Sequence, residues 1–211
     1  MVEAVGRKNA VKKITSNLEE IKDITEYGRN LNDLPKFILD RLKVYLKDKG
    51  IRHDIIDAAF VSKDGNGGGD DLVAIVNRTN ALQDFLGTSE GENLLAGYKR
   101  AANILKAEGK KAKANKESLP TGAPSKPKQA EAVALYDALQ TAAPAIETAL
   151  EGENYAEAMQ NLAKLRSPID AFFDHVTVVS DDSVVRENNL RLLAMIRDTA
   201  RQIADFEAIQ G

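Results

Sequence analysis

The chain of 211 residues contains no cysteine and no tryptophan, and only 5% of its residues are aromatic. Without cysteine it has no disulfide scaffold, no thiolate nucleophile and no Cys-ligated zinc or iron–sulfur site. No apolar run approaches the roughly 18–20 residues that a membrane span requires. The first residues also lack the apolar core of a secretory signal. These absences predict a cytoplasmic protein with no membrane partner.

The net charge of −3 conceals a strong asymmetry along the chain. Residues 98–128 carry nine Lys/Arg against two Asp/Glu, a net charge of +7. Residues 129–211 carry six against fourteen, a net charge of −8. The pI of about 5.6 argues against a protein that coats nucleic acid by bulk charge. A polyanion is therefore expected to meet one basic segment and an acidic C-terminal half.

Apolar residues recur with helical spacing along nearly the whole chain. Residues 35–49 place four of them at i, i+4, i+7 and i+8, namely Ile38, Leu42, Tyr45 and Leu46. This spacing predicts an amphipathic helix. Similar patterns predict further helices at about residues 51–60, 92–108, 129–150, 155–166 and 183–207. Two more are predicted from Leu72 to Gly87 and from Ser167 onward. Only residues 176–180 look strand-like, so the predicted fold class is all-α, a helical bundle.

Capping and helix-breaking residues mark the ends of these segments. Asp70 and Asp71 stand where an N-cap belongs, and Asn154 forms a capping box with Glu157. Ser167 followed by Pro168 predicts a cap and a first helical turn. Pro144 predicts a break or a new first turn inside 129–150.

The domain organisation follows from these patterns. Residues 1–30 are predicted to be an N-terminal helical leader, and residues 31–211 a helical domain. Within that domain, residues 109–128 contain three prolines, two glycines and no aromatic residue. Such a composition predicts a flexible Lys/Pro-rich segment.

Motifs that carry chemistry are scarce. His53 and His175 each stand beside an aspartate, but a metal-dependent hydrolase needs further ligands that converge with them. The glycine-rich run 65–69 lacks the spacing of a phosphate-binding loop. Asp64 and Asn66 open like a calcium loop, but its closing position holds Ile75 instead of Glu. We therefore predict no catalytic residue and no metal site, and a small hydrolase built on the two histidines stays an alternative.

The basic segment is the most informative part of the sequence. Within two helical turns it places an aromatic ring, two cations and an amide, and a further lysine follows. These residues are Tyr98, Lys99, Arg100, Asn103 and Lys106. Lys99, Asn103 and Lys106 are related by i, i+4 and i+7 and so share a face. Cations hold phosphates, while Tyr, Asn and Arg can stack on or hydrogen-bond to single-stranded bases. The alternative is an ordinary solvated helix followed by a lysine-rich linker.

Four stretches of the sequence, in order, resemble one known family. They are Phe37–Leu46 with His53–Ala58, Leu94–Leu105, Ser167–Asp174 and Asp181–Leu193. Together they resemble the C-terminal anticodon-binding region of the beta subunit of bacterial glycyl-tRNA synthetase. That region is similar to the all-helical, DALR-type anticodon-binding domain of the arginyl and some other class I synthetases. The resemblance covers about residues 34–207.

The resemblance implies a tRNA-binding module without a ligase centre. Its implied partners are tRNA-Gly, the alpha subunit and the remainder of the beta subunit. ATP and Mg are implied to act at the alpha subunit, so no cofactor is expected in this chain. The alternative function is a helical scaffold for protein interactions that binds no nucleic acid.

The predicted tRNA-binding residues follow from this interpretation. The groove for the anticodon loop is expected to be lined by the five residues of the basic segment, Tyr98, Lys99, Arg100, Asn103 and Lys106, with Arg41, Lys43 and Arg52 nearby. The last motif departs from the family at Asn189, where an arginine is expected. Arg186 and Arg191 remain there as candidate contacts, with ion pairs inside the domain as the alternative for Arg186 and Arg41.

Overall fold

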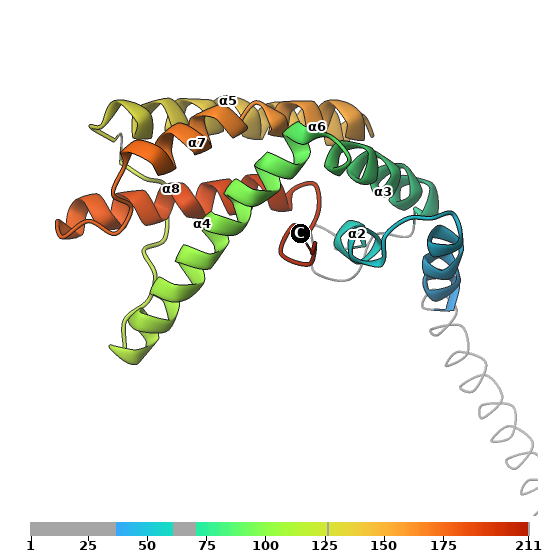
Figure 1. Ribbon diagram of the computed structural model, residues 1–211, viewed down its shortest axis with the longest axis horizontal. Coiled ribbons are helices and arrows are strands. Elements are labelled where there is room, and N and C mark those ends of the chain that lie inside the picture. Colours follow the sequence, from blue (N-terminus) through green and yellow to red (C-terminus); the bar gives the residue numbers. More distant parts are fainter. Residues whose placement is uncertain (1–36, 61–70, 126, 211) are drawn as a thin grey trace, which may run out of the picture. The chain divides into compact units, whose positions relative to one another are not determined.

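The computed structural model describes residues 37–60, 71–125 and 127–210, and in these ranges every regular element is a helix (Figure 1). Residues 37–48 are helical. The labelled helices that follow are α2 (His53–Ala59), α3 (Leu72–Leu86), α4 (Ser89–Ala114), α5 (Ala130–Glu151), α6 (Tyr155–Ala163), α7 (Arg166–His175) and α8 (Ser183–Arg201). The all-α prediction is confirmed.

The chain divides into two compact units, Met1–Tyr45 and Leu46–Gly211. All the labelled helices belong to the second unit. The predicted leader at residues 1–30 and the glycine-rich run at 65–69 lie outside the described residues.

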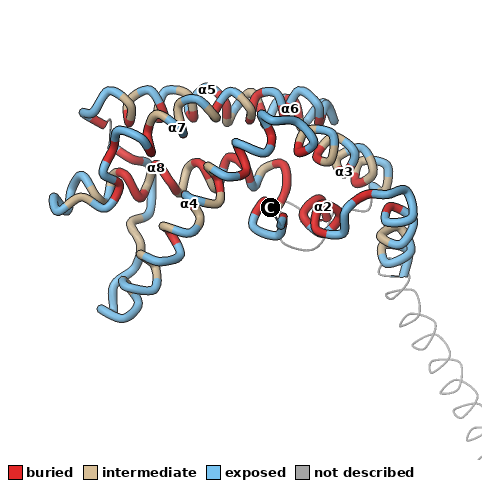
Figure 2. The backbone as a smooth tube through the Cα atoms, viewed as in Figure 1, coloured by how far each residue is buried: buried red, intermediate tan, exposed pale blue. Residues whose placement is uncertain are grey.

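The second unit is a bundle held together mainly by the contacts of α4 and α5. α5 packs against α6, α7 and α8, while α4 packs on α8 and also contacts α3 and α7. α3 in turn packs against α6 and α2. Figure 2 shows the buried residues on the sides of the helices that face one another. The most buried side chains come from several helices, among them Leu82, Leu139, Leu162, Ile169 and Leu192.

Side-chain caps begin several of these helices. Asp71 accepts hydrogen bonds from the N–H groups of Val73 and Ala74, at 2.8 and 3.0 Å. The Asn154 side chain accepts from the N–H of Glu157 at 3.2 Å. Both predicted caps are therefore confirmed, because each satisfies a first-turn N–H that has no partner within its helix.

Four predicted boundaries are wrong. α8 ends at Arg201, so the helix predicted at about 183–207 is shorter than expected. α7 begins at Arg166, so Ser167 and Pro168 lie inside its first turn, where a proline removes no intrahelical hydrogen bond. α5 continues through Pro144, which is exposed, so solvent reaches the helix at this position. α4 continues through Ala114, so the first six residues of the predicted flexible segment at 109–128 are helical.

Two glycines let α4 pack closely against its neighbours. A Cβ at Gly91 would lie 2.1 Å from the carbonyl oxygen of Phe85, which is in the last turn of α3. A Cβ at Gly97 would lie 2.9 Å from a methyl group of Ile169 on α7. The missing side chains therefore set the close approach of α4 to the end of α3 and to α7.

The segment that follows α8 links α2 to α4. Its apolar residues Ile203, Phe206 and Ile209 are buried, and the Phe206 ring lies 5.5 Å from the ring of Tyr98 on α4. The N–H of Gln210 donates to the Asp54 carboxylate of α2 at 2.8 Å. We call residues 202–210 the C-terminal segment.

Asp54 is only 3% exposed, yet its carboxylate is well supplied with donors. Burial opposes its ionisation, but the hydrogen bond and charge of Arg52 and the N–H groups of Gln210 and Ile55 outweigh burial. They lower the pKa of Asp54 below its usual value of 3.8. The ionised carboxylate therefore stabilises the fold at pH values above the usual pKa. This stabilisation is lost as the pH falls through the lower pKa of the folded state.

Asp54→Asn is expected to lower the free energy of unfolding at pH 7 by about 1–3 kcal/mol, because an amide cannot accept from all these donors. The difference from the wild-type chain should shrink as the pH falls below about 4. Urea titration followed by circular dichroism at several pH values measures both effects. Asp137→Asn, which removes an exposed carboxylate from α5, is the control. A difference that does not change with pH would contradict the assignment.

Candidate nucleic-acid interface

A row of polar side chains runs along one exposed side of α4. The structure places the half-buried Lys99 and the exposed Asn103 and Lys106 on this side, as their spacing predicts. Because α4 continues to Ala114, Lys110 and Lys113 extend the same row at i+11 and i+14 from Lys99. We call these five residues the α4 row. The sequence pattern missed its last two members because it placed the end of the helix at residue 108.

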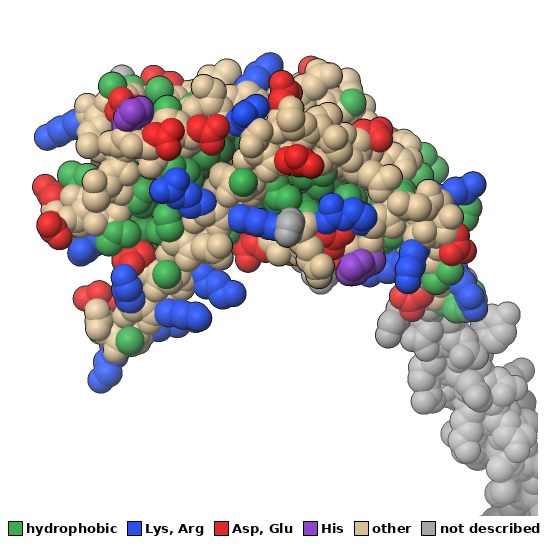
Figure 3. Space-filling model, in the orientation of Figure 1, with side chains coloured by type: hydrophobic (Ala, Val, Ile, Leu, Met, Phe, Trp, Pro, Cys, Tyr) green, Lys and Arg blue, Asp and Glu red, His purple; other side chains and the backbone are tan. Residues whose placement is uncertain are grey.

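The opposite side of α4 fixes the direction in which the row points. Leu94, Tyr98, Ala101 and Leu105 are buried against the bundle. No residue of α4 after Leu105 is buried, so the last part of the helix extends beyond its packed region. Figure 3 shows Lys and Arg side chains around this end of α4.

Arg100 lies beside the α4 row and is held by an aromatic ring. Its guanidinium carbon lies 4.4 Å from the centre of the Phe173 ring on α7. Phe173 is buried, whereas Arg100 is exposed. The stacking holds the planar guanidinium at the surface, with its N–H edge available to a ligand.

Tyr98 does not lie in the predicted groove. Its side chain is 2% exposed and packs against Phe206. Burial raises the pKa of its hydroxyl to about 12, and the charges of Glu207 and Asp205 add to this shift. The hydroxyl has no hydrogen-bond partner among the described residues. In this structure Tyr98 is therefore a core residue and cannot stack on a base.

Arg52 is linked to α4 only indirectly, because the C-terminal segment contacts both. Its guanidinium donates to the Asp54 carboxylate and to the carbonyl of Gln210, yet its side chain remains 55% exposed. The same segment contacts Tyr98 through Phe206. Arg52 therefore has a structural role at the segment's end and keeps exposed surface for a ligand.

Arg41 and Lys43 belong to the first unit. The Arg41 guanidinium lies 5.2 Å from the centre of the Phe37 ring, in a cation–π contact. Lys43 is half-buried. Their predicted place beside the residues of α4 stays a prediction.

Arg186 and Arg191 lie on α8 and line a different groove. This groove has a volume of about 510 Å³ and lies between α8 and the end of α4, with Lys111 on its other wall. Arg186 donates to the carbonyl of Ser180, and Arg191 pairs with Glu187 at 3.4 Å. The lysines of the α4 row do not line this groove.

Asn189 has a structural role in the last motif. It is 2% exposed, and its side-chain amide donates to the carbonyls of Thr177 and Val178, both at 3.3 Å. The amide thus ties the turn before α8 to the helix. A phosphate contact at this position is incompatible with that burial.

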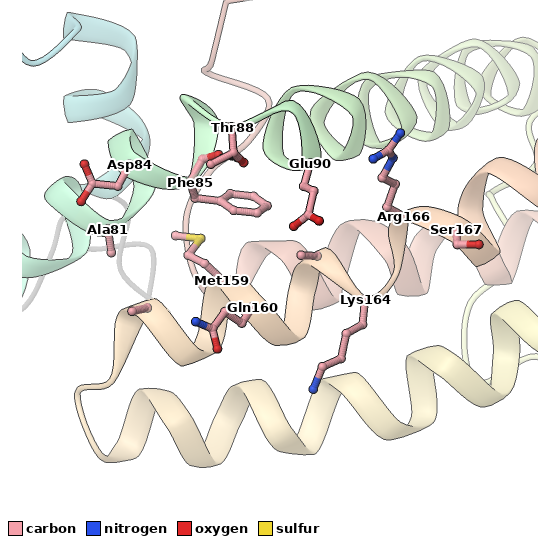
Figure 4. A pocket seen from close by; sticks show the side chains of 12 residues that line it. Ala81, Asp84, Phe85, Thr88, Glu90, Met159, Gln160, Lys164, Arg166 and Ser167 are labelled. Carbon is pink, nitrogen blue, oxygen red and sulfur yellow. Dashed lines mark hydrogen bonds between the residues drawn. The ribbon is translucent and has the colours of Figure 1, made fainter.

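A groove of about 610 Å³ lies between α3, α6 and the first turns of α4 and α7. Figure 4 shows the Phe85 ring, the Met159 thioether and the Glu90 carboxylate around this space. Asp84 also lines it, as do Lys164 and Arg166. None of the predicted tRNA-binding residues does so. The two carboxylates and the two cations of the lining cancel, so the groove carries no net positive charge to attract an RNA phosphate.

The two histidines lie on different helices, His53 at the start of α2 and His175 at the end of α7. Both are exposed. In the described ranges no group of three or more His, Cys, Asp or Glu side chains is placed to hold a metal ion.

Comparison with known families assigns the bundle. Residues 94–206 match the DALR anticodon binding domain. The chain belongs to this family. The match begins at the first buried leucine of α4 and ends at Phe206, so the DALR domain comprises most of α4, all of α5 to α8 and part of the C-terminal segment. The predicted anticodon-binding fold is confirmed.

Three relatives of the chain carry the same name. The chain is 49% identical over 179 residues to the glycine–tRNA ligase beta subunit of Rhodospirillum centenum. It is 45% identical over 196 residues to that of Ruegeria sp. and 48% identical over 177 residues to that of Phenylobacterium zucineum. These alignments cover 83–92% of this chain and 24–27% of each relative, so the chain spans about a quarter of their length. The resemblance found in the sequence is confirmed.

No helix in the described ranges is both long enough and apolar enough to cross a bilayer.

Tyr98→Phe is expected to leave the free energy of unfolding within about 0.5 kcal/mol of wild type or to raise it, because the hydroxyl that is removed has no partner. RNA affinity should not change either, because the ring is not accessible. Phe206→Ala, by contrast, removes the ring that packs on Tyr98 and should cost about 3–5 kcal/mol. Thermal unfolding and RNA titration measure these effects. A specific loss of RNA affinity in a stable Tyr98→Phe chain would place the hydroxyl in the binding site.

Proposed function

We propose that the chain is the anticodon-recognition module of a glycine–tRNA ligase beta subunit. The observation that supports this most directly is the DALR match, because it includes the helix that carries the α4 row and Arg100. The identity of 45–49% to beta subunits of that ligase supports the choice of tRNA-Gly as the RNA partner.

In this proposal two kinds of side chain share the work. Lys99 and Lys106 hold RNA phosphates at and beside the anticodon loop, since an ammonium group is a point charge with no preferred orientation. Arg100 and Asn103 contact bases, since guanidinium and amide groups have directional donors, and Asn also offers an acceptor. Phe173 supports this role because it holds the Arg100 guanidinium in place before RNA binds.

Arg52 is expected to contribute from beside the C-terminal segment, where its side chain remains 55% exposed. Arg41 and Lys43 remain expected contributors from the first unit. Arg186 and Arg191 are weaker candidates, because both are engaged with neighbouring groups on or beside α8. The acidic part of the chain, residues 129–211, is expected to face away from the tRNA or toward partner subunits.

The chemistry of ligation belongs elsewhere in this proposal. ATP and Mg are assigned to the alpha subunit, and this chain contributes tRNA binding with no cofactor of its own. Its protein partners are that alpha subunit and the remaining three-quarters of the beta subunit. The site of action is the cytoplasm.

Titration of the chain with labelled tRNA-Gly, and with the same tRNA carrying an altered anticodon, tests the proposal. Preference for the native anticodon should persist at the higher of two salt concentrations, because base contacts depend on salt less than phosphate contacts do. Arg100→Ala and Asn103→Ala should each weaken binding of the native tRNA by about 1–3 kcal/mol and reduce the preference. Lys164→Gln on α6 is the matched surface control.

Base recognition would be contradicted if the chain bound both tRNAs equally and lost both at the higher salt concentration. Absence of binding by a folded chain would favour the alternative, a helical scaffold that contacts protein only. Loss of affinity in Lys164→Gln equal to that in Arg100→Ala would show that total charge, and not the α4 surface, determines binding.

A further inference from the structure

The exposed end of α4 carries cations that no ion pair among the described residues explains. The lysines of the α4 row are Lys99, Lys106, Lys110 and Lys113, and none of them forms an ion pair among the described residues. Lys111, on another side of the same helix, pairs with Glu108 at 2.6 Å. The helix therefore offers one row of uncompensated charge and one compensated lysine beside it.

The geometry of the row is linear and extended. Lys99 and Lys113 are fourteen residues apart, which corresponds to about 21 Å along the helix axis. Three of the four lysines lie after Leu105, the last buried residue of α4. A ligand can therefore approach this part of the helix along its side without first displacing the bundle.

The end of α4 is held in place although it is exposed. After the helix ends, the N–H of Glu117 donates to the carbonyl of Ala112 at 2.8 Å. Leu119 then returns along the helix, close enough that a Cβ on Gly109 would lie 3.4 Å from its side chain. These contacts lower the entropic cost of presenting the lysines in one line.

Helix electrostatics alone do not account for the row. Cations in the last turn of a helix offset its dipole, which applies to Lys111 and Lys113. The effect falls off beyond that turn, so Lys99 and Lys106 gain little from it. A row continuing over four turns indicates an extended anionic ligand.

The neighbours of the row favour a nucleic-acid backbone over an acidic protein. Protein interfaces depend on buried aromatic and arginine anchors. The exposed side of α4 beyond Asn103 instead offers lysines and the small residues Ala107 and Ala114. Lysine ammonium groups bind phosphates without reading bases.

We infer that the lysines of the α4 row beyond Asn103, Lys106, Lys110 and Lys113, bind the sugar–phosphate backbone of the RNA stem next to the loop, independently of its base sequence. The choice of RNA rests on the proposed function. The near end of the row, with Arg100 and Asn103, then meets the loop, while its far end follows the stem. The helix thus divides into a base-reading part and a backbone-binding part.

The test compares a triple variant, Lys106→Gln/Lys110→Gln/Lys113→Gln, with Lys111→Gln. Each is titrated with tRNA-Gly, with the altered-anticodon tRNA, and with a hairpin that keeps the anticodon stem but has an unrelated loop. Affinities are measured between about 50 and 200 mM salt, where phosphate contacts dominate the dependence. Circular dichroism confirms that α4 remains helical in each variant.

The triple variant should lose affinity by the same factor for all three RNAs. The slope of log affinity against log salt should become shallower by about two to three, close to 0.7–0.9 for each phosphate that a lysine no longer neutralises. Lys111→Gln should change neither quantity. An unchanged slope in the triple variant, or an equal change in Lys111→Gln, would overturn the inference.

The two proposals fail in different ways. If the anticodon preference persists but the triple variant keeps its salt slope, the backbone-binding inference is wrong and the proposed function stands. If the triple variant loses the predicted slope but the wild-type chain shows no anticodon preference, base recognition is wrong and the backbone-binding surface stands. A loss of affinity confined to the RNA with the native loop would overturn the assignment to the stem.

Discussion

The burial of one side of α4 determines where every candidate RNA-binding side chain of that helix lies. Leu94, Tyr98 and Leu105 pack into the bundle, and successive residues of a helix differ by about 100° in direction. A rotation of α4 by one residue would bury lysines and expose leucines. The apolar contacts of α4 therefore set the position of the polar row on its other side, although none of these apolar residues touches a ligand.

The C-terminal segment secures that arrangement from the α2 side. Phe206 packs against Tyr98, and the N–H of Gln210 is held by Asp54. Arg52 takes part in the same cluster and remains partly exposed. The C-terminal segment thus joins α4, the most basic helix, to Arg52, which lies nearly fifty residues before Tyr98 in the chain.

Much of the fold could be predicted from local signals. Helical periodicity identified the helices, and the side-chain chemistry of Asp71 and Asn154 located two helix starts correctly. Pro144 was misjudged because solvent reaches an exposed helix at this position, so the helix tolerates the proline. The end of α4 was misjudged because its last nine residues bury nothing, so apolar periodicity offered no signal there.

The candidate site was predicted less completely, for reasons that depend on tertiary structure. Tyr98 lies four residues after Leu94 and seven before Leu105, so its spacing already favoured the core, but an aromatic ring beside two cations also fits RNA stacking. Only the contact with Phe206 decides between these roles. The stacking of Arg100 on Phe173 joins residues 73 positions apart, and no local pattern predicts it.

The most direct measurement of the central claim is lysine footprinting. The chain is acetylated alone and in complex with tRNA-Gly, and the modification of each lysine is read by mass spectrometry. The account predicts that tRNA protects Lys99, Lys106, Lys110 and Lys113 and leaves Lys111 and Lys164 as reactive as in the free chain. Protection of Lys164 or Lys111, with the α4 row still reactive, would contradict it.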